Sequence, residues 1–97
     1  MRELLVDSGD VRLAVRDQAG PESAIIFLHF GGGNLAMWQQ AMSHFGGRHR
    51  LVLIDLRGHG RSDRPAAGYH IDTMATDVVG VMQALGMRTR ANLVCKP

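Results

Sequence analysis

Short apolar stretches separated by turn-forming residues recur along this chain and predict β-strands. Residues 4–6 and 11–15 are the first two such stretches, and apolar and polar positions alternate along the second. Alternation with a period of two is typical of a strand with one buried face. The sequence Ser8-Gly9-Asp10 between them favours a tight turn, so we expect an antiparallel hairpin at one edge of a sheet.

Two further apolar runs, at 24–28 and 51–54, fit strands that are buried in a sheet, and Asn92-Leu93-Val94 begins a third such strand. The segments between them carry apolar residues three to four positions apart, which predicts helices over 35–45 and 71–85. Residues that favour helix starts or ends lie at the ends of both segments, with Asp72 in the first turn of the second: Asn34, Gly46, Gly47, Asp72 and Gly86. Because a helix crosses between consecutive strands, these three strands are expected to run parallel. The predicted order is β-β-β-α-β-α-β, an α/β fold in which a mostly parallel sheet carries an N-terminal antiparallel hairpin and helices on both faces.

Composition narrows the class of protein without pointing to a partner. Hydrophobic residues make up 45% and charged residues 21% of the 97 positions, which is ordinary for a folded domain. The 11 Lys and Arg residues are interleaved with 9 Asp and Glu residues, so the net charge of +2 forms no basic stripe and nucleic-acid binding is not expected. No apolar run approaches the roughly 20 residues of a membrane helix and no signal-peptide core follows Met1, so we expect no membrane contact and a cytoplasmic location.

The first segment with chemistry of its own runs from His29 to Asn34, where the strand over 24–28 passes into the predicted helix. Its glycines let the backbone approach a ligand closely, and amides at a helix start favour negative charge. The turn therefore suits a phosphate or the developing oxyanion of an acyl-transfer reaction. Tight packing of the helix on the sheet is the alternative interpretation, and His29 is interpreted as satisfying backbone groups rather than as catalytic.

A dinucleotide-binding site is the main competing interpretation. The sequence Gly31-x-Gly33-x-x-Ala36 matches the fingerprint of nucleotide-binding βαβ units, with Asp55 as the acid that binds ribose. However, two predicted strands precede this turn, and Asp55 opens a long loop rich in Arg, Gly and His that ribose binding does not need. A phosphate-binding P-loop is less expected than a dinucleotide site, because no Gly-Lys-Ser/Thr sequence follows the glycines.

The segment Asp55-Leu56-Arg57-Gly58-His59-Gly60-Arg61-Ser62-Asp63 decides between these interpretations. Together with Leu28-His29-Phe30-Gly31-Gly32-Gly33 and Trp38, it resembles the α/β-hydrolase family, in which a strand-end His-Gly-x segment precedes a helix with tryptophan and then Asp-x-x-Gly-x-Gly-x-Ser. The resemblance spans nearly the whole chain, whereas the chain matches only the N-terminal part of a family member. It implies a partial α/β-hydrolase fold and a parent enzyme of serine-esterase type that acts on a small ester-like substrate, with no metal and no other cofactor.

The same resemblance implies that the nucleophile is missing from residues 1–97. The family carries its serine in Gly-x-Ser-x-Gly, on a sharp turn from strand to helix, and this turn is expected after Val94, where the chain reads Cys95-Lys96-Pro97. Ser62 lies in the earlier loop without the second flanking glycine. Cys95, the single cysteine, lacks the glycines, the following helix and an acid and base. We therefore expect residues 1–97 to be the truncated N-terminal part of one hydrolase domain, inactive by itself.

Residues that are present also receive roles from the resemblance. The backbone N–H of Gly31, or of Phe30, is expected to supply half of an oxyanion hole, and Met37 and Trp38 are candidates for lining an acyl pocket, although a tryptophan at helical spacing is more often core. A last set of residues is expected to hold the loops near the site by hydrogen bonds: His29, Asp55, Arg57, His59, Ser62 and Asp63.

A non-catalytic interaction domain is the remaining alternative. The last predicted strand, from residue 92, is expected to leave an open sheet edge, and such an edge can pair with another chain. Self-association through this edge is therefore a further expectation.

Overall fold

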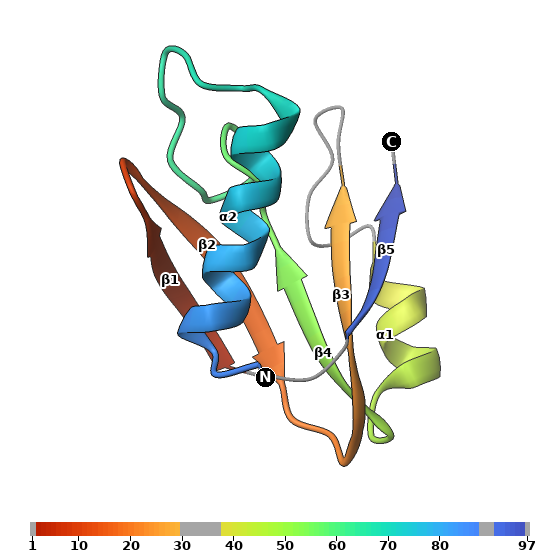
Figure 1. The fold of residues 1–97 in the computed structure, drawn as a ribbon. Coiled ribbons are helices and arrows are strands. Elements are labelled where there is room, and N and C mark those ends of the chain that lie inside the picture. Colours follow the sequence, from red (N-terminus) through yellow and green to blue (C-terminus); the bar gives the residue numbers. More distant parts are fainter. Residues whose placement is uncertain (1, 30–37, 88–90, 97) are drawn as a thin grey trace.

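The computed structural model describes residues 2–29, 38–87 and 91–96, and this part of the chain contains five strands and two helices (Figure 1). In chain order the elements are β1 (Arg2–Ser8), β2 (Val11–Gln18), β3 (Glu22–His29), α1 (Gln39–Phe45), β4 (His49–Ile54), α2 (Ile71–Ala84) and β5 (Asn92–Lys96). The predicted succession β-β-β-α-β-α-β is confirmed.

The five strands form one mixed sheet in the order β1-β2-β4-β3-β5. β1 and β2 pair as an antiparallel hairpin in which Ser8 lies opposite Val11, and the tight turn is completed by Gly9 at φ +59, a conformation that glycine adopts without strain. β4, β3 and β5 run parallel to one another, and β2 pairs with β4 antiparallel. The hairpin therefore lies at one edge of a parallel set, as the sequence predicts.

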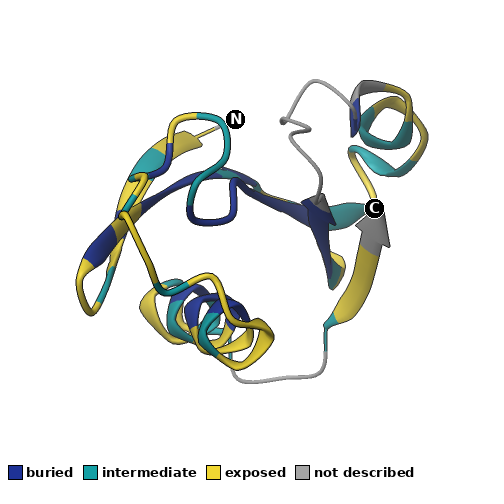
Figure 2. Cartoon of the chain, turned by 90° about the horizontal axis from the view of Figure 1, so that it is seen from above, coloured by how far each residue is buried: buried dark blue, intermediate teal, exposed yellow. Residues whose placement is uncertain are grey.

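Alternate residues of the central strands divide the core between the two faces of the sheet. On one face the buried set from β3, β4 and α2 comprises Ile26, Leu28, Val52, Ile54, Met74, Val78 and Val81. On the other face the set comprises Ile25, Phe27, Leu51, Leu53 and Trp38, with Ala41, Met42 and Phe45 of α1 packed against it. Figure 2 shows α2 and α1 on opposite sides of the sheet, which confirms the predicted helices on both faces. Because both faces are covered, β3 and β4 are apolar without alternation.

Several elements differ in length from their predicted ranges. β1 and β2 extend through polar residues, and Arg2 pairs with Asp17 in register. β5 continues through Cys95 and Lys96, which pair with Leu28 and His29 of β3. Strand pairing joins backbone groups and therefore continues past the apolar residues that reveal a strand in sequence. α1 begins at Gln39, and the helix start that we predicted at Asn34 lies outside the described residues.

The second helix ends as predicted. α2 runs to Ala84, and Gly86 follows at φ +69, the left-handed conformation common just after a helix. Neither of the described helices is long and apolar enough to cross a membrane.

Candidate active site

The carboxyl ends of the three parallel strands lie at the same edge of the sheet (Figure 1). His29, the last residue of β3, pairs in register with Lys96 of β5, so the backbone that leaves β3 starts beside the end of β5. Phe30, Gly31 and Met37 lie outside the described residues, and the roles predicted for them and for the His29 side chain stay predictions.

The loop that follows β4 is tied to β2 through Ser62. The Ser62 hydroxyl accepts a hydrogen bond from the Ala14 N–H at 2.8 Å and donates to the carbonyl oxygen of Asp55. Only 4% of Ser62 is exposed. Because its hydroxyl is buried and hydrogen-bonded on both sides, Ser62 holds the loop and is not presented to a substrate.

The loop folds back over the Asp55 carboxylate, which is itself buried. The backbone N–H of Arg61 donates to Asp55 Oδ2 at 3.1 Å, and Gly60 passes so close that a Cβ there would lie 2.1 Å from the same oxygen. Only glycine fits this position, and its φ of +50 also favours glycine. Asp55 therefore faces its own loop.

Asp63 anchors the far side of the same loop. Its carboxylate Oδ2 accepts the Arg12 N–H at 2.8 Å, and its own N–H donates to the Arg12 carbonyl at 2.9 Å. These two hydrogen bonds attach the loop to the start of β2.

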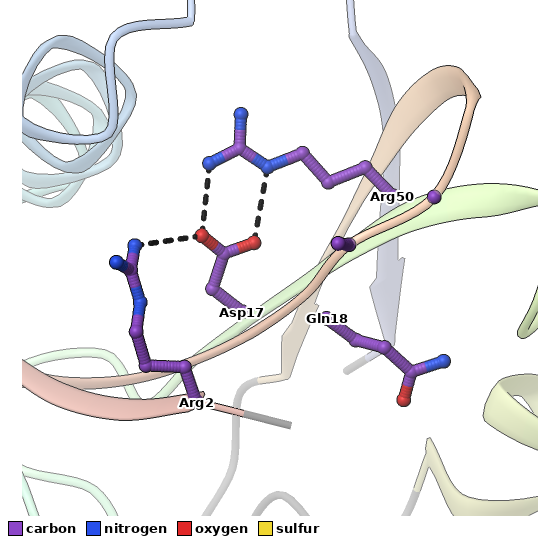
Figure 3. Close-up of a pocket in the computed structure, with 6 residues that line it drawn as sticks. Arg2, Asp17, Gln18 and Arg50 are labelled. Carbon is purple, nitrogen blue, oxygen red and sulfur yellow. Dashed lines mark hydrogen bonds and ion pairs between the residues drawn. The ribbon is translucent and has the colours of Figure 1, made fainter.

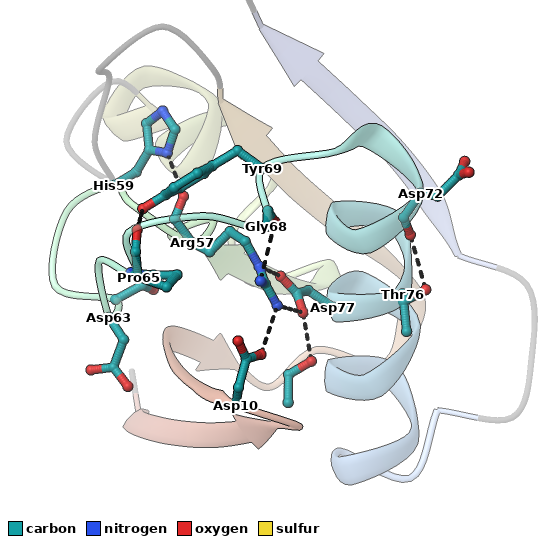
Figure 4. Close-up of polar contacts among 12 residues, drawn as sticks. Asp10, Arg57, His59, Asp63, Pro65, Gly68, Tyr69, Asp72, Thr76 and Asp77 are labelled. Atoms are coloured by element: carbon teal, nitrogen blue, oxygen red, sulfur yellow. Dashed lines mark hydrogen bonds and ion pairs between the residues drawn. The ribbon is translucent and has the colours of Figure 1, made fainter.

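Arg57 joins the loop to two other parts of the molecule (Figure 4). Its guanidinium binds both carboxylate oxygens of Asp77 on α2, from Nε at 2.7 Å and from Nη2 at 2.9 Å. Nη1 donates to the Gly68 carbonyl at 3.2 Å, and Nη2 also lies 3.4 Å from Asp10 Oδ1 in the β1–β2 turn. Ser8 completes the cluster by donating to Asp77 Oδ1 at 2.6 Å.

The Arg57–Asp77 pair is almost fully buried, with 3% and 2% of the two side chains exposed. Hydrogen bonding to Asp77 raises the pKa of Arg57 above its ordinary value, although burial acts in the opposite direction. The Arg57 carbonyl also accepts a hydrogen bond from His59 Nδ1 at 3.0 Å. Arg57 thus links the loop to α2 through its side chain and contacts the His59 ring through its carbonyl.

Sequence reasoning missed Asp77, although a signal was present. Asp77 lies three residues after Met74 and four before Val81, so it falls on the apolar stripe of the predicted helix. A carboxylate on a buried helix face requires a cationic or hydrogen-bonding partner. That requirement points to a buried arginine, and the loop supplies Arg57.

Trp38 packs in the core on the α1 face of the sheet. Its ring lies 5.0 Å from that of Phe27, and the residue is buried among side chains of β3 and β4. Its predicted contribution to an acyl pocket stays a prediction.

A second polar cluster lies apart from this edge, where the start of β1 and the end of β2 meet the start of β4 (Figure 3). Asp17 receives two hydrogen bonds from Arg50, at 3.0 and 2.8 Å, and one from Arg2 at 3.1 Å. The hydrogen bond from Arg50 is the main reason that the pKa of Asp17 lies below its ordinary value, and burial opposes this effect. Within residues 2–29, 38–87 and 91–96, no three His, Cys, Asp or Glu side chains are grouped to hold a metal ion.

Comparison with known proteins places this arrangement in a family. The family model for the alpha/beta hydrolase fold matches residues 23–94. The chain is 40% identical over 62 residues to 3-oxoadipate enol-lactonase 2 of Acinetobacter baylyi, a match that covers 64% of this chain and 23% of the relative. It is 34% identical over 80 residues to 2-(acetamidomethylene)succinate hydrolase of Mesorhizobium japonicum, covering 82% of this chain and 28% of the relative.

A solved structure agrees with these sequence matches. Est816, described as an N-acyl homoserine lactone degrading enzyme, superimposes with a TM-score of 0.86 at 37% identity, covering 93% of this chain and 34% of that protein. This chain therefore spans about a quarter to a third of the length of the relatives it matches. The family match and the shared fold together show that the chain belongs to the α/β-hydrolase family.

Proposed function

We propose that residues 1–97 form the N-terminal part of the catalytic domain of a serine-type hydrolase that cleaves ester or lactone bonds by acyl transfer. The observation that supports this most directly is the register between β3 and β5, in which His29 lies beside Lys96. Neighbouring strands in a sheet lie about 4.8 Å apart. A nucleophile on the turn after β5 and a backbone N–H just after β3 can therefore reach the same substrate carbonyl, as acyl transfer requires.

In this proposal the chain contributes the scaffold and half of the oxyanion hole. A backbone N–H of Gly31 or Phe30 donates to the oxyanion that forms when the serine attacks the carbonyl carbon. The serine, its base and the acid that orients the base belong to sequence beyond residues 1–97. The buried hydrogen bonds of Ser62 and Arg57 keep the neighbouring loop fixed, so that it need not reorganise during the reaction.

The substrate class is proposed from the relatives. Two of those named above are described as an enol-lactonase and an N-acyl homoserine lactone degrading enzyme. A lactone is a cyclic ester, and its hydrolysis uses the same nucleophile and oxyanion hole as that of an open ester. The dinucleotide-binding alternative is weakened by Asp55, because an acid that binds ribose must face the ligand, whereas this carboxylate is buried under its own loop.

A fluorophosphonate probe, which reacts covalently with activated serines, tests the proposal on the gene product isolated from its native source. We expect mass spectrometry to find one labelled serine outside residues 1–97, with the heat-denatured protein as an unlabelled control. Label on Ser62, or hydrolysis of ester substrates without any labelled serine, would overturn the proposal.

The 97-residue chain provides the complementary test. Purified by itself, it should hydrolyse p-nitrophenyl acetate no faster than buffer, and the Ser62→Ala and Cys95→Ala variants should behave identically. Activity that disappears in one of these variants would mean that the chain carries its own nucleophile.

A further inference from the structure

Two arginines share one carboxylate near the start of β4, at the opposite end of this strand from the candidate active site. Arg2 of β1 and Arg50 of β4 both bind Asp17 of β2 (Figure 3). The Arg2 and Arg50 side chains are 67% and 27% exposed, whereas that of Asp17 is 7% exposed. Because one guanidinium is enough to neutralise the carboxylate, the cluster keeps one positive charge that no acid within it balances.

Both arginines keep hydrogen-bond donors for a further partner. Arg50 donates to Asp17 from Nε and Nη2, and Nη2 also lies 3.5 Å from the Leu85 carbonyl at the end of α2. Arg2 donates to Asp17 from Nη2. A guanidinium carries N–H donors on all of its nitrogens, and no partner among the described residues binds Arg50 Nη1 or the Nε and Nη1 of Arg2. The cluster therefore offers mainly donors to a ligand.

An open hollow of about 580 Å³ adjoins the cluster. It is lined by Arg2, Asp17 and Arg50, together with residues 18–20, which lead out of β2. Among the described residues that line the hollow, Asp17 is the only acid, and both of its oxygens already accept hydrogen bonds. The β1–β2 hairpin lies at the opposite edge of the sheet from β5, after which the remainder of the proposed domain would continue.

We infer that this hollow binds a phosphate group, either as the free ion or as the monoester of a small molecule. The planar fork of arginine matches the oxygens of phosphates and carboxylates. Both guanidiniums bind the same oxygen of Asp17, Oδ2, so they lie close enough for one anion to accept hydrogen bonds from both. A phosphate group has three acceptor oxygens and nearly two charges at neutral pH, and a carboxylate has fewer of each, which favours phosphate.

The inferred site is separate from the proposed catalytic edge. Arg50 lies near the start of β4, whereas Asp55 follows the last residue of that strand. A phosphate group held by Arg2 and Arg50 links β1 to β4, and Arg50 also contacts α2, so the bound anion stabilises the fold and takes no part in acyl transfer. The inference does not depend on the proposed hydrolase activity, and the failure of either leaves the other standing.

Titration of the isotope-labelled 97-residue chain with inorganic phosphate, followed by NMR at a constant ionic strength of about 0.15 M, tests the inference. We expect the backbone amides of Ala19 and Gly20 to shift in a saturable manner with a Kd of about 1–10 mM, because salt screens the partly exposed arginines. Acetate should bind at least about fivefold more weakly. Tighter binding of glycerol phosphate would identify a monoester as the ligand, and weaker binding the free ion. No saturable shift with either phosphate, or equal binding of acetate, would refute the inference.

Two substitutions that remove the same charge distinguish this site from general attraction of anions. Arg2→Gln removes donors at the hollow and should raise the Kd for phosphate at least about fivefold. Arg12→Gln is the matched control, since the Arg12 side chain is 62% exposed and lies at the other end of the hairpin; it should change the Kd less than about twofold. Equal effects of the two substitutions would contradict the inference, and the NMR spectra verify that both variants fold.

Discussion

Replacing Asp77 by asparagine should reveal how strongly the buried ion pair holds the loop after β4. Asp77→Asn keeps the shape of the side chain but removes the charge that faces Arg57. The guanidinium then retains the Gly68 carbonyl at 3.2 Å and Asp10 at 3.4 Å. Of the two short bonds to the carboxylate, at 2.7 and 2.9 Å, the new amide can accept only one, without the charge. Because only 3% of Arg57 is exposed, we expect little water to replace the lost bond.

The expected cost follows from burial. Removing one partner of a buried pair typically lowers the free energy of unfolding by about 3–5 kcal/mol, because the remaining charge loses its buried counterion. The exposed Asp10, 3.4 Å away, compensates the charge of Arg57 only in part. A chain of this length has a total stability of about 5–15 kcal/mol. Each kcal/mol shifts Tm by about 4–8 °C in a domain of this size, so Tm should fall by at least about 12 °C.

Urea unfolding of the 97-residue chain, followed by circular dichroism at low protein concentration, measures the effect. Glu3→Gln is the control, since the Glu3–Arg16 pair at 2.8 Å is partly exposed and should contribute no more than about 1 kcal/mol. The double variant Arg57→Leu with Asp77→Leu removes both charges and should be more stable than Asp77→Asn. The reasoning fails if Asp77→Asn costs no more than Glu3→Gln, or if the double variant is the least stable.

Three further substitutions test other contacts. Gly60→Ala puts a Cβ 2.1 Å from a buried carboxylate oxygen. Its control is Gly9→Ala, since Gly9 has a similar φ but open space around it, and this control should cost roughly 1–2 kcal/mol. In urea unfolding Gly60→Ala should cost clearly more than the control, and equal costs would contradict the close contact. Ser62→Ala should lower the unfolding free energy by about 1–3 kcal/mol, since it leaves buried backbone groups unpaired, and a neutral result would mean that water reaches them. Arg50 lowers the pKa of Asp17 in the folded chain, so on acidification the unfolded chain binds that proton first. The free energy of unfolding should therefore fall as the pH drops through and below the ordinary pKa range of the carboxyl. Urea midpoints measured between about pH 6 and 2 should decline less steeply for Asp17→Asn than for the unaltered chain, and parallel declines would exclude this contribution.

Local patterns in the sequence were sufficient to predict which segments form strands and helices. The apolar run at 24–28 lies within β3, and the helical spacing of Met74, Val78 and Val81 lies within α2. The turn at Gly9 also followed from neighbouring residues alone. Such features depend on backbone sterics and on side-chain periodicity within one element, which a single sequence displays.

The candidate site was predictable only in part. The motif around Asp55 and the glycines after His29 indicated the family, and the family model and related structures confirm it. The sequence did not predict that Ser62 is buried between Ala14 and Asp55, because its hydrogen-bond partners are far away along the chain.

The sequence by itself therefore determined the order of the elements, the hairpin and the membership of a hydrolase family. Only the tertiary structure decided that β4 lies between β2 and β3, that His29 lies beside Lys96, and that Arg57 binds Asp77. The physical reason is that these pairings join segments distant in sequence. Each is selected by the total burial and hydrogen bonding of the whole sheet, and no local pattern specifies the partner.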